Sequence, residues 1–162
     1  MKIIRLSRGQ TAIVDDIDYT DLSQFKWYLD SQGLYVVHGI PYNGKQTKES
    51  MHRRILGAQP GQDVDHINHN GLDNRRENLR LCTRSQNNAN MKKHGSTSSK
   101  FKGVVWRKAR TKWIAQIIHR EDHKRRHTYL GSFKNEEDAA RAYDRAAKEL
   151  FGEFALLNFP IK

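Results

Sequence analysis

The stretch at residues 64–88 reads VDHINHNGLDNRRENLRLCTRSQNN, and it decides the fold of the first half of the chain. It begins with a β-prone segment that ends in the pair Asp65-His66. A long polar loop follows, and a second short β-prone run covers residues 79–83. A helix then starts, with Thr83 or Ser85 as the capping residue. This pattern predicts two short strands, a polar loop between them and a helix.

The segment resembles the HNH endonuclease motif, in the form found in phage intron-encoded members whose last motif histidine is an asparagine. The resemblance implies two strands and a helix that together hold one metal ion. It also implies that His66 is the general base that takes a proton from water, which an imidazole does well near neutral pH. Asp65 and Asn87 correspond to the metal ligands, and Asn78 to the middle asparagine that braces the loop so that His66 points correctly.

Oxygen ligands such as those of Asp65 and Asn87 suit magnesium or manganese better than zinc. We therefore expect one divalent ion, which would polarise the phosphate and stabilise the leaving oxygen. Many HNH proteins carry paired Cys-x-x-Cys motifs for a structural zinc, whereas this chain has the single cysteine Cys82. No structural zinc is expected, so packing alone should hold the core.

Neighbouring side chains on a regular strand point to opposite faces, so Asp65 and His66 can share a site only if the strand twists or ends there. Two other histidines are open to interpretation. For His52, packing or a phosphate contact explains the residue as well as catalysis does, and His69 is best explained as a loop residue. Four arginines beside the motif are expected to contact DNA phosphates, with plain solvated charge as the alternative: Arg75, Arg76, Arg80 and Arg84.

The domain boundary is predicted at a small, polar stretch without periodicity, residues 92–100. We expect an HNH nuclease domain at 1–92 with its core motif at 50–92, a linker at 93–100, and a second domain at 101–162. Before the motif, the sequence predicts these elements: a strand, turn and strand at 3–14, a short helix at 15–27, a strand at 34–37 and a hairpin turn at 41–44.

After the linker, three β-prone runs at 103–107, 113–118 and 127–133 are separated by basic turns. Asn135 then starts a helix, with Asp138 in the capping-box position, and Gly152 ends it. Small residues form one stripe of this helix, which lets it lie close to a sheet. The C-terminal half therefore predicts a three-stranded antiparallel sheet packed on one helix, and the whole chain an α+β fold with a ββα-metal nuclease core and extra β-strands.

The C-terminal half resembles the APETALA/ethylene-response-factor DNA-binding domain. The matching pieces are FKGVV at 101–105, KWIAQI at 112–117, YLGSF at 129–133, EDAARAYDRAA at 137–147 and LNFP at 157–160. The resemblance implies that the sheet lies in the major groove of DNA. The candidate DNA contacts are Lys102, Arg107, Arg110, Lys112, His127 and Tyr129. The predicted core residues are Trp113, Leu130, Phe133, Ala140, Tyr143 and Phe159. Plant members usually have arginine at the positions of Val105 and Ile118, so their target sequence is not transferred.

The net charge of +11 is spread unevenly. Residues 1–30 hold four basic and five acidic residues, residues 75–100 hold seven and one, and residues 101–130 hold nine and two. Two separate basic blocks indicate two surfaces for a polyanion. The alternative is a solubilising surface, which usually interleaves both signs.

These features predict a metal-dependent DNA endonuclease of the phage homing type that nicks double-stranded DNA held by its C-terminal domain. The alternative is a non-catalytic transcriptional regulator with a decayed nuclease core, against which the intact Asp65, His66, Asn78 and Asn87 speak. An RNA-binding role lacks the aromatic stacking pair or motif typical of it. No apolar run approaches the roughly 20 residues of a membrane span. We expect a cytoplasmic, phage-encoded protein of a bacterial host cell; a monomer is favoured, with the oligomeric state left open.

Overall fold

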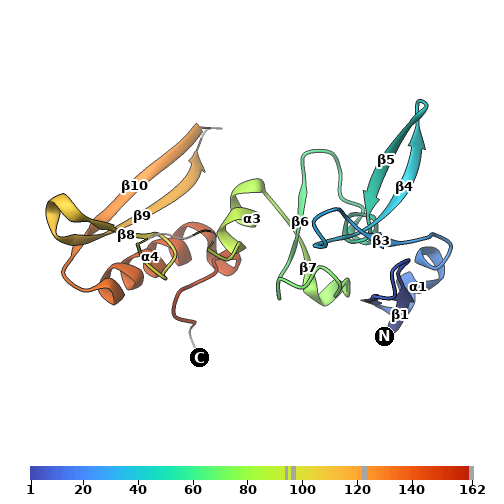
Figure 1. The fold of residues 1–162 in the computed structure, drawn as a ribbon, viewed down its shortest axis with the longest axis horizontal. Coiled ribbons are helices and arrows are strands. Elements are labelled where there is room, and N and C mark those ends of the chain that lie inside the picture. Colours follow the sequence, from blue (N-terminus) through green and yellow to red (C-terminus); the bar gives the residue numbers. More distant parts are fainter. Residues whose placement is uncertain (94, 96–97, 122–123, 161–162) are drawn as a thin grey trace. The chain divides into compact units, whose positions relative to one another are not determined.

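The computed structural model describes residues 1–93, 95, 98–121 and 124–160, and the fold is of the predicted mixed α+β type (Figure 1). Contacts within the chain divide it into two compact units, Met1–Arg84 and Ser85–Lys162. None of the helices formed by the described residues is long and apolar enough to cross a bilayer.

The first unit consists of short strands joined by two helices and a 3-10 turn. Its elements are β1 (Lys2–Arg5), β2 (Thr11–Val14), α1 (Asp16–Leu22), β3 (Tyr28–Leu29), β4 (Val36–Tyr42), β5 (Lys45–Ser50), α2 (Met51–Leu56), β6 (Asp63–His66), η1 (Arg76–Asn78) and β7 (Leu79–Cys82). The strands form the antiparallel pair β1-β2, the antiparallel sheet β3-β4-β5 and the antiparallel pair β6-β7. The predicted strand pairs at 3–14 and around the polar loop are confirmed.

Two predicted boundaries in this unit were wrong. The helix expected over residues 15–27 ends at Leu22, because the buried Trp27 turns its indole N–H toward the Leu22 carbonyl oxygen at 2.7 Å. The hairpin turn lies at Asn43 and Gly44, both with positive φ, while Pro41 lies inside β4 opposite Gln46. β3 pairs only with the first two residues of β4 and does not reach Pro41. The missing N–H of the proline therefore breaks no hydrogen bond on the β3 edge of β4.

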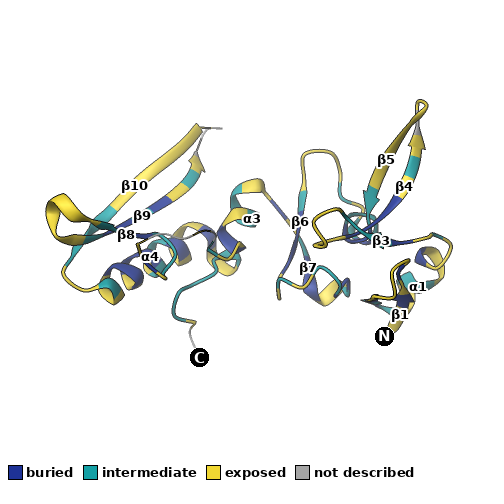
Figure 2. Cartoon of the chain, viewed as in Figure 1, coloured by how far each residue is buried: buried dark blue, intermediate teal, exposed yellow. Residues whose placement is uncertain are grey.

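The core of the first unit is one apolar cluster to which both strands of the predicted nuclease motif contribute (Figure 2). Its buried members are Ile4, Leu6, Ala12, Val14, Leu22, Trp27, Val36, Met51, Ile55, Val64 and Leu79. Val64 on β6 and Leu79 on β7 anchor the motif strands there, next to Met51 and Ile55 of α2. The polar ends of β6 and β7 are therefore held in place by the burial of their apolar neighbours.

The second unit is a three-stranded antiparallel sheet, in the order β10-β9-β8, packed on the long helix α4 as predicted (Figure 1). Its elements are α3 (Arg84–Asn90), which begins at the last residue of the first unit, β8 (Val104–Arg107), η2 (Lys108–Arg110), β9 (Lys112–Glu121), β10 (Lys124–Phe133), α4 (Glu136–Phe151) and η3 (Gly152–Phe154). The six predicted core residues are buried or pack against the buried clusters.

Close packing between α4 and the sheet depends on small residues. Ala139 and Ala140 are fully buried on α4, beside Ala115 of β9. Gly103, with φ +75°, lies so close to Tyr143 that an added Cβ would be 1.9 Å from the Tyr143 Cδ2 atom. Asn135 occupies the N-cap position, as predicted, and Gly152 ends the helix. The hydrogen bonds expected of a capping box are not formed. The Asn135 side chain donates to the Asp138 carboxylate and does not accept a hydrogen bond from a helix N–H.

The helix α3 belongs to the second unit by its packing. Ala89 is buried in a cluster with Ile117, Tyr143, Ala147 and Phe151. The division between the compact units therefore falls ahead of the expected linker at 93–100. Three residues of that linker, at positions 94, 96 and 97, lie outside the described residues.

Candidate active site and DNA-binding surface

Asp65 and His66 lie at the end of β6, where the strand pairs with β7 in the register Asp65↔Arg80 and His66↔Leu79. Both side chains are almost fully buried, with 6% and 5% of the residue surface exposed. The strand ends at His66, which is one of the two geometries that allow neighbouring side chains to serve one site. Because the strand ends there, the side chains of Asp65 and His66 need not point to opposite faces of a sheet.

The His66 imidazole is enclosed by two other rings. The Tyr35 ring stacks on it with centroids 5.8 Å apart at 27°, and the His52 ring meets it edge-on at 5.0 Å. Burial lowers the pKa of His66, while a hydrogen bond from its Nε2 to Asn74 Oδ1 at 3.4 Å and the nearby carboxylate of Asp65 act in the opposite direction. A lowered pKa keeps the imidazole neutral at pH 7, which is the form that accepts a proton.

Asn78 joins the two ends of the polar loop between β6 and β7. Its Oδ1 accepts the backbone N–H of Asn68 at 3.0 Å, and its Nδ2 donates to the Asp73 carbonyl oxygen at 2.7 Å. Its own carbonyl accepts the N–H of Ile67, the residue after His66, at 2.9 Å. These contacts are the ones that a loop-bracing residue needs to make.

Asn74 is a site residue that sequence reasoning missed. It is completely buried, contacts the ring of His66, and donates through Nδ2 to the Gly71 carbonyl oxygen at 3.1 Å. Its backbone N–H donates to Ile13 of β2 at 2.8 Å, which fastens the loop to the core. The loop holds asparagines at 68, 70, 74 and 78 and has no periodicity, so the sequence carried no signal that the buried Asn74, and not the exposed Asn68 or Asn70, lies next to His66.

His52, the second residue of α2, packs beside His66 and Tyr35 with 7% of its surface exposed. Its Nδ1 is buried without a hydrogen-bond partner among the residues that the structure describes. Burial, then the charges of His66 and Arg53, lower the pKa of His52 to about 3. An uncharged, enclosed ring favours the packing interpretation over a phosphate contact. His69 is a turn residue with φ 62°, in keeping with its expected loop role.

The predicted metal ligands lie on different compact units. Asp65, in the first unit, accepts hydrogen bonds from Arg80 Nε at 3.0 Å and Nη2 at 2.8 Å. Asn87 lies on α3, which is packed into the second unit. The described residues contain no cluster of three or more His, Cys, Asp or Glu side chains that could hold a metal. An ion at Asp65 would therefore need further donors besides such side chains.

All four arginines of the motif already bind carboxylates of the first unit. The pairs are Arg75 with Asp73 at 2.8 Å, Arg76 with Asp18 at 2.7 Å, Arg80 with Asp65 at 2.8 Å and Arg84 with Asp63 at 3.1 Å. The guanidinium groups are thereby held at fixed places around the polar loop and the ends of β6 and β7. Their expected phosphate contacts stay a prediction.

Five of the six candidate DNA contacts of the second unit are exposed on or beside its sheet. Arg107, Arg110 and Tyr129 line one hollow of about 350 Å³. Lys112 is the cross-strand neighbour of Arg107, and His127 lies on β10, two residues from Tyr129. The sheet thus brings basic and aromatic groups to one region, which suits contact with phosphates and base edges.

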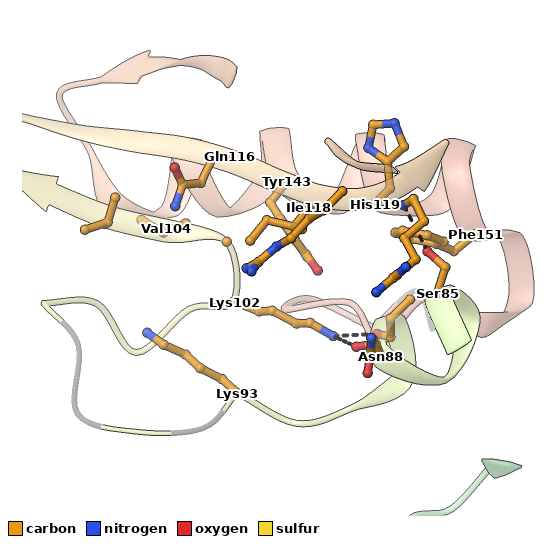
Figure 3. A pocket seen from close by; sticks show the side chains of 15 residues that line it. Ser85, Asn88, Lys93, Lys102, Val104, Gln116, Ile118, His119, Tyr143 and Phe151 are labelled. Atoms are coloured by element: carbon orange, nitrogen blue, oxygen red, sulfur yellow. Dashed lines mark hydrogen bonds between the residues drawn. The ribbon is translucent and has the colours of Figure 1, made fainter. Parts of the chain in front are cut away.

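Lys102, the sixth candidate, has a different environment. Its half-buried side chain lines a cavity of about 580 Å³, and its ammonium group donates to the carbonyl oxygens of Asn88 and Ala89 (Figure 3). It also donates to the Met91 carbonyl oxygen at 2.8 Å. Burial lowers the pKa of Lys102 to about 8. The Lys102 ammonium group, which was expected to contact DNA, is therefore bound to three carbonyl oxygens at the end of α3.

Two family models match this chain: HNH endonuclease over residues 52–89 and AP2 domain over residues 99–153. An uncharacterised HNH endonuclease of Acanthamoeba polyphaga mimivirus is 36% identical over 156 residues, which make up 93% of this chain and 76% of that protein. The chain belongs to the HNH endonuclease family. The predicted resemblance is confirmed over both halves of this nuclease.

The plant relatives of this HNH endonuclease match its C-terminal AP2 domain alone. A dehydration-responsive element-binding protein, 2E, of Oryza sativa subsp. japonica is 53% identical over 49 residues, 30% of this chain and 15% of that protein. An ethylene-responsive transcription factor of Arabidopsis thaliana is 50% identical over 60 residues, 37% of this chain and 31% of that protein. The AP2 domain gives the nuclease a DNA-binding module.

The HNH match ends at residue 89 and thus includes α3 almost entirely, although α3 packs with the AP2 domain. By sequence this helix belongs to the nuclease, and by contacts it belongs to the DNA-binding unit. The family match and the packing thus assign this helix to different parts of the chain.

Proposed function

We propose that this HNH endonuclease hydrolyses phosphodiester bonds of double-stranded DNA with one bound magnesium or manganese ion, and nicks one strand. The observation that carries the proposal is the neutral, enclosed imidazole of His66 at the end of β6, directly beside Asp65 and above a loop braced by Asn78.

In this mechanism His66 takes a proton from the water molecule that attacks the phosphorus atom. The P–O bond to the leaving oxygen breaks and that oxygen takes up a proton from solvent, so one strand is left with a phosphate end and a hydroxyl end. The rings of Tyr35 and His52 and the amide of Asn74 keep the imidazole in a fixed orientation. General-base catalysis of this kind contributes ~10²–10⁴-fold to the rate.

Asp65 and Asn87 would hold the metal ion. A carboxylate and an amide oxygen are hard donors of the kind that magnesium and manganese prefer, so the donor set fits such an ion. When bound, the ion polarises the phosphate and stabilises the charge on the leaving oxygen. Arg80 keeps a positive charge beside Asp65, where it would also attract the phosphate.

The AP2 domain would hold the DNA duplex through the exposed side of its sheet. Arg107, Arg110, Lys112, His127 and Tyr129 are the proposed contacts, since basic and polar side chains on a sheet reach phosphates and base edges in the major groove. One active site per chain favours a nick by a monomer over a double-strand cut. The likeness to phage intron-encoded members and the viral relative support a homing-type enzyme that acts in the cytoplasm of a host cell.

Plasmid relaxation tests the proposal. The full chain with magnesium should convert supercoiled plasmid to the nicked form, and His66→Ala should bind the plasmid equally well but nick it at least about 100-fold more slowly. His69→Asn is the matched control, because asparagine tolerates the left-handed backbone of that turn and the residue has no assigned role. If the parent binds DNA and neither protein nicks it under these conditions, the chain is a DNA-binding regulator.

A further inference from the structure

The face of the AP2 sheet that is turned away from α4 continues beyond the strand β8. On β9, Ala115 and Ile117 are buried in the clusters that contain α4. The residues that alternate with them belong to the opposite face, and these are Gln116, Ile118 and Arg120. β8 pairs with β9 only as far as Ala115, whereas β10 pairs with β9 to the end of that strand. The sheet therefore ends in a two-stranded ribbon of β9 and β10.

Two arginines lie directly opposite each other on this ribbon. Arg120 of β9 pairs with Arg125 of β10, and both residues are exposed. Both line the cavity of about 580 Å³, together with Gln116 and Ile118 of the same face (Figure 3). Like charges at directly opposite positions of a sheet repel each other. A bound anion relieves this repulsion, and a phosphate group accepts strong hydrogen bonds from guanidinium groups.

The strand that carries Arg120 is fixed by the helix α3. The Arg120 backbone N–H donates to the Ser85 hydroxyl at 3.4 Å, and Ala89 packs with Ile117 in one buried cluster. The described residues that line the cavity include no carboxylate. The arginine pair is therefore presented on a supported strand, in a positively charged hollow that suits an anion.

A second basic group lies at the other end of the same face. Arg107 of β8 is the cross-strand neighbour of Lys112 on β9. Arg120 lies eight positions after Lys112, which corresponds to roughly 26 Å at about 3.3 Å per residue. The major groove of DNA is about 12 Å wide. The face is therefore long enough for its two ends to reach phosphates on both sides of the groove, while Gln116 and Ile118 between them face the base edges.

We propose that Arg120 and Arg125 form a second phosphate-binding site of the AP2 domain, which binds one DNA backbone while the end with Arg107 binds the other. The inference deepens the proposed function, because it rests on the AP2 sheet as the surface that holds the duplex, but not on hydrolysis. It extends the proposed DNA contacts to the part of the sheet that β8 does not cover. The duplex is thereby held on both sides of its major groove.

The test measures the affinity of the full chain for a short double-stranded oligonucleotide, without magnesium, by fluorescence anisotropy over a series of salt concentrations. Arg125→Gln removes the charge of one arginine, and Arg125→Lys keeps it. Arg126→Gln is the matched control, because Arg126 is the next residue of β10, is also exposed and belongs to the opposite face of the ribbon. The thermal unfolding midpoint of each variant is measured as well.

Each DNA phosphate that a protein neutralises contributes about −0.9 to the slope of log K against log salt. Arg125→Gln should therefore reduce the slope by about one and weaken binding ~8-fold at about 0.1 M salt, with the difference from the parent vanishing near 1 M. Arg125→Lys should bind nearly as the parent does, and Arg126→Gln should keep the slope of the parent. Adding Arg107→Gln to Arg125→Gln should add the two losses, because the two sites are far apart. The thermal midpoint of Arg125→Gln should equal or exceed that of the parent, because a repulsion is removed.

The inference is overturned if Arg125→Gln and Arg126→Gln change the affinity and the salt slope equally, since the total charge would then explain both. It is also overturned if Arg125→Gln binds the duplex as the parent does. If a lower thermal midpoint shows that Arg125→Gln loses its fold, Arg120→Gln decides by the same measurements, because the contact with Ser85 uses only the Arg120 backbone. A parent protein that binds the duplex but never nicks it refutes the proposed hydrolysis and leaves this inference standing, whereas a parent that does not bind the duplex overturns it.

Discussion

Acid should destabilise the first unit through His52. Burial, reinforced by His66 and Arg53, lowers the pKa of His52 to about 3 in the folded protein, whereas an unfolded histidine titrates near 6.5. Between these values the unfolded chain binds a proton that the folded chain excludes. The contribution of His52 to the free energy of unfolding is therefore fully present above about pH 6.5. It falls steadily as the pH is lowered toward 3.

With these two pKa values, linkage gives a loss of about 2 kcal/mol in the free energy of unfolding between pH 7.5 and pH 5 from His52 alone. Urea unfolding followed by tryptophan fluorescence measures this, because Trp27 is buried in the same core as Met51, the neighbour of His52. His52→Phe keeps an aromatic ring in the site and cannot take up a proton. The pH-dependent loss should therefore be about 2 kcal/mol smaller in His52→Phe than in the parent.

The comparison uses the change with pH, so it does not depend on how well phenylalanine fits the site. Groups that do not interact with His52 titrate alike in both proteins and cancel in the difference, whereas its coupling to His66 stays within the difference. If the parent and His52→Phe lose the same free energy between pH 7.5 and pH 5, burial does not hold His52 neutral, and the account of this three-ring cluster is wrong.

Three further predictions concern the two units. Gly103→Ala should lower the free energy of unfolding of the second unit, measured in urea, by about 2–5 kcal/mol, because the new Cβ would clash with Tyr143 at positive φ. Gly57→Ala, which is also at positive φ but in open space, should lower that of the first unit by only about 1–2 kcal/mol. Equal losses in the two variants would argue against the clash. Asn78→Ala should cost about 1–3 kcal/mol and slow nicking at unchanged DNA affinity, since two loop contacts disappear; a parent-like nicking rate would remove its bracing role. The single-turnover rate should fall in acid with a midpoint below 6.5, because burial lowers the pKa of His66; a midpoint above that value, in a series from pH 5 to 8, would contradict the assigned environment.

Elements were predicted at the right place where the local residue pattern and the family motif indicated the same structure. β6, β7 and α4 lie where they were predicted, and the helix ends at Gly152 as expected. The helix before Trp27 was overestimated, because a contact between the tryptophan ring and the Leu22 carbonyl ends it. Such a contact depends on the tertiary fold and leaves no mark in the periodicity.

The candidate site was predictable as a set of residues but not as a set of contacts. Asp65 and His66 lie together at a strand end, as the motif indicates. The arginines read as free basic charge. Two of the acids that bind them, Asp18 and Asp63, lie outside the motif, and the pairing of Arg75 with Asp73 and of Arg80 with Asp65 depends on how the loop and strands fold. Lys102 read as a DNA contact for the same reason, since its partners on α3 lie across the expected linker.

The most direct test of the account is single-turnover nicking by His66→Ala at saturating protein, with and without added imidazole. A general base at this position predicts a rate ~10²–10⁴-fold below that of the parent, DNA affinity unchanged, and partial recovery as imidazole is added. A variant that nicks at the parent rate would show that His66 takes no part in the chemistry and would contradict the assignment of the active site.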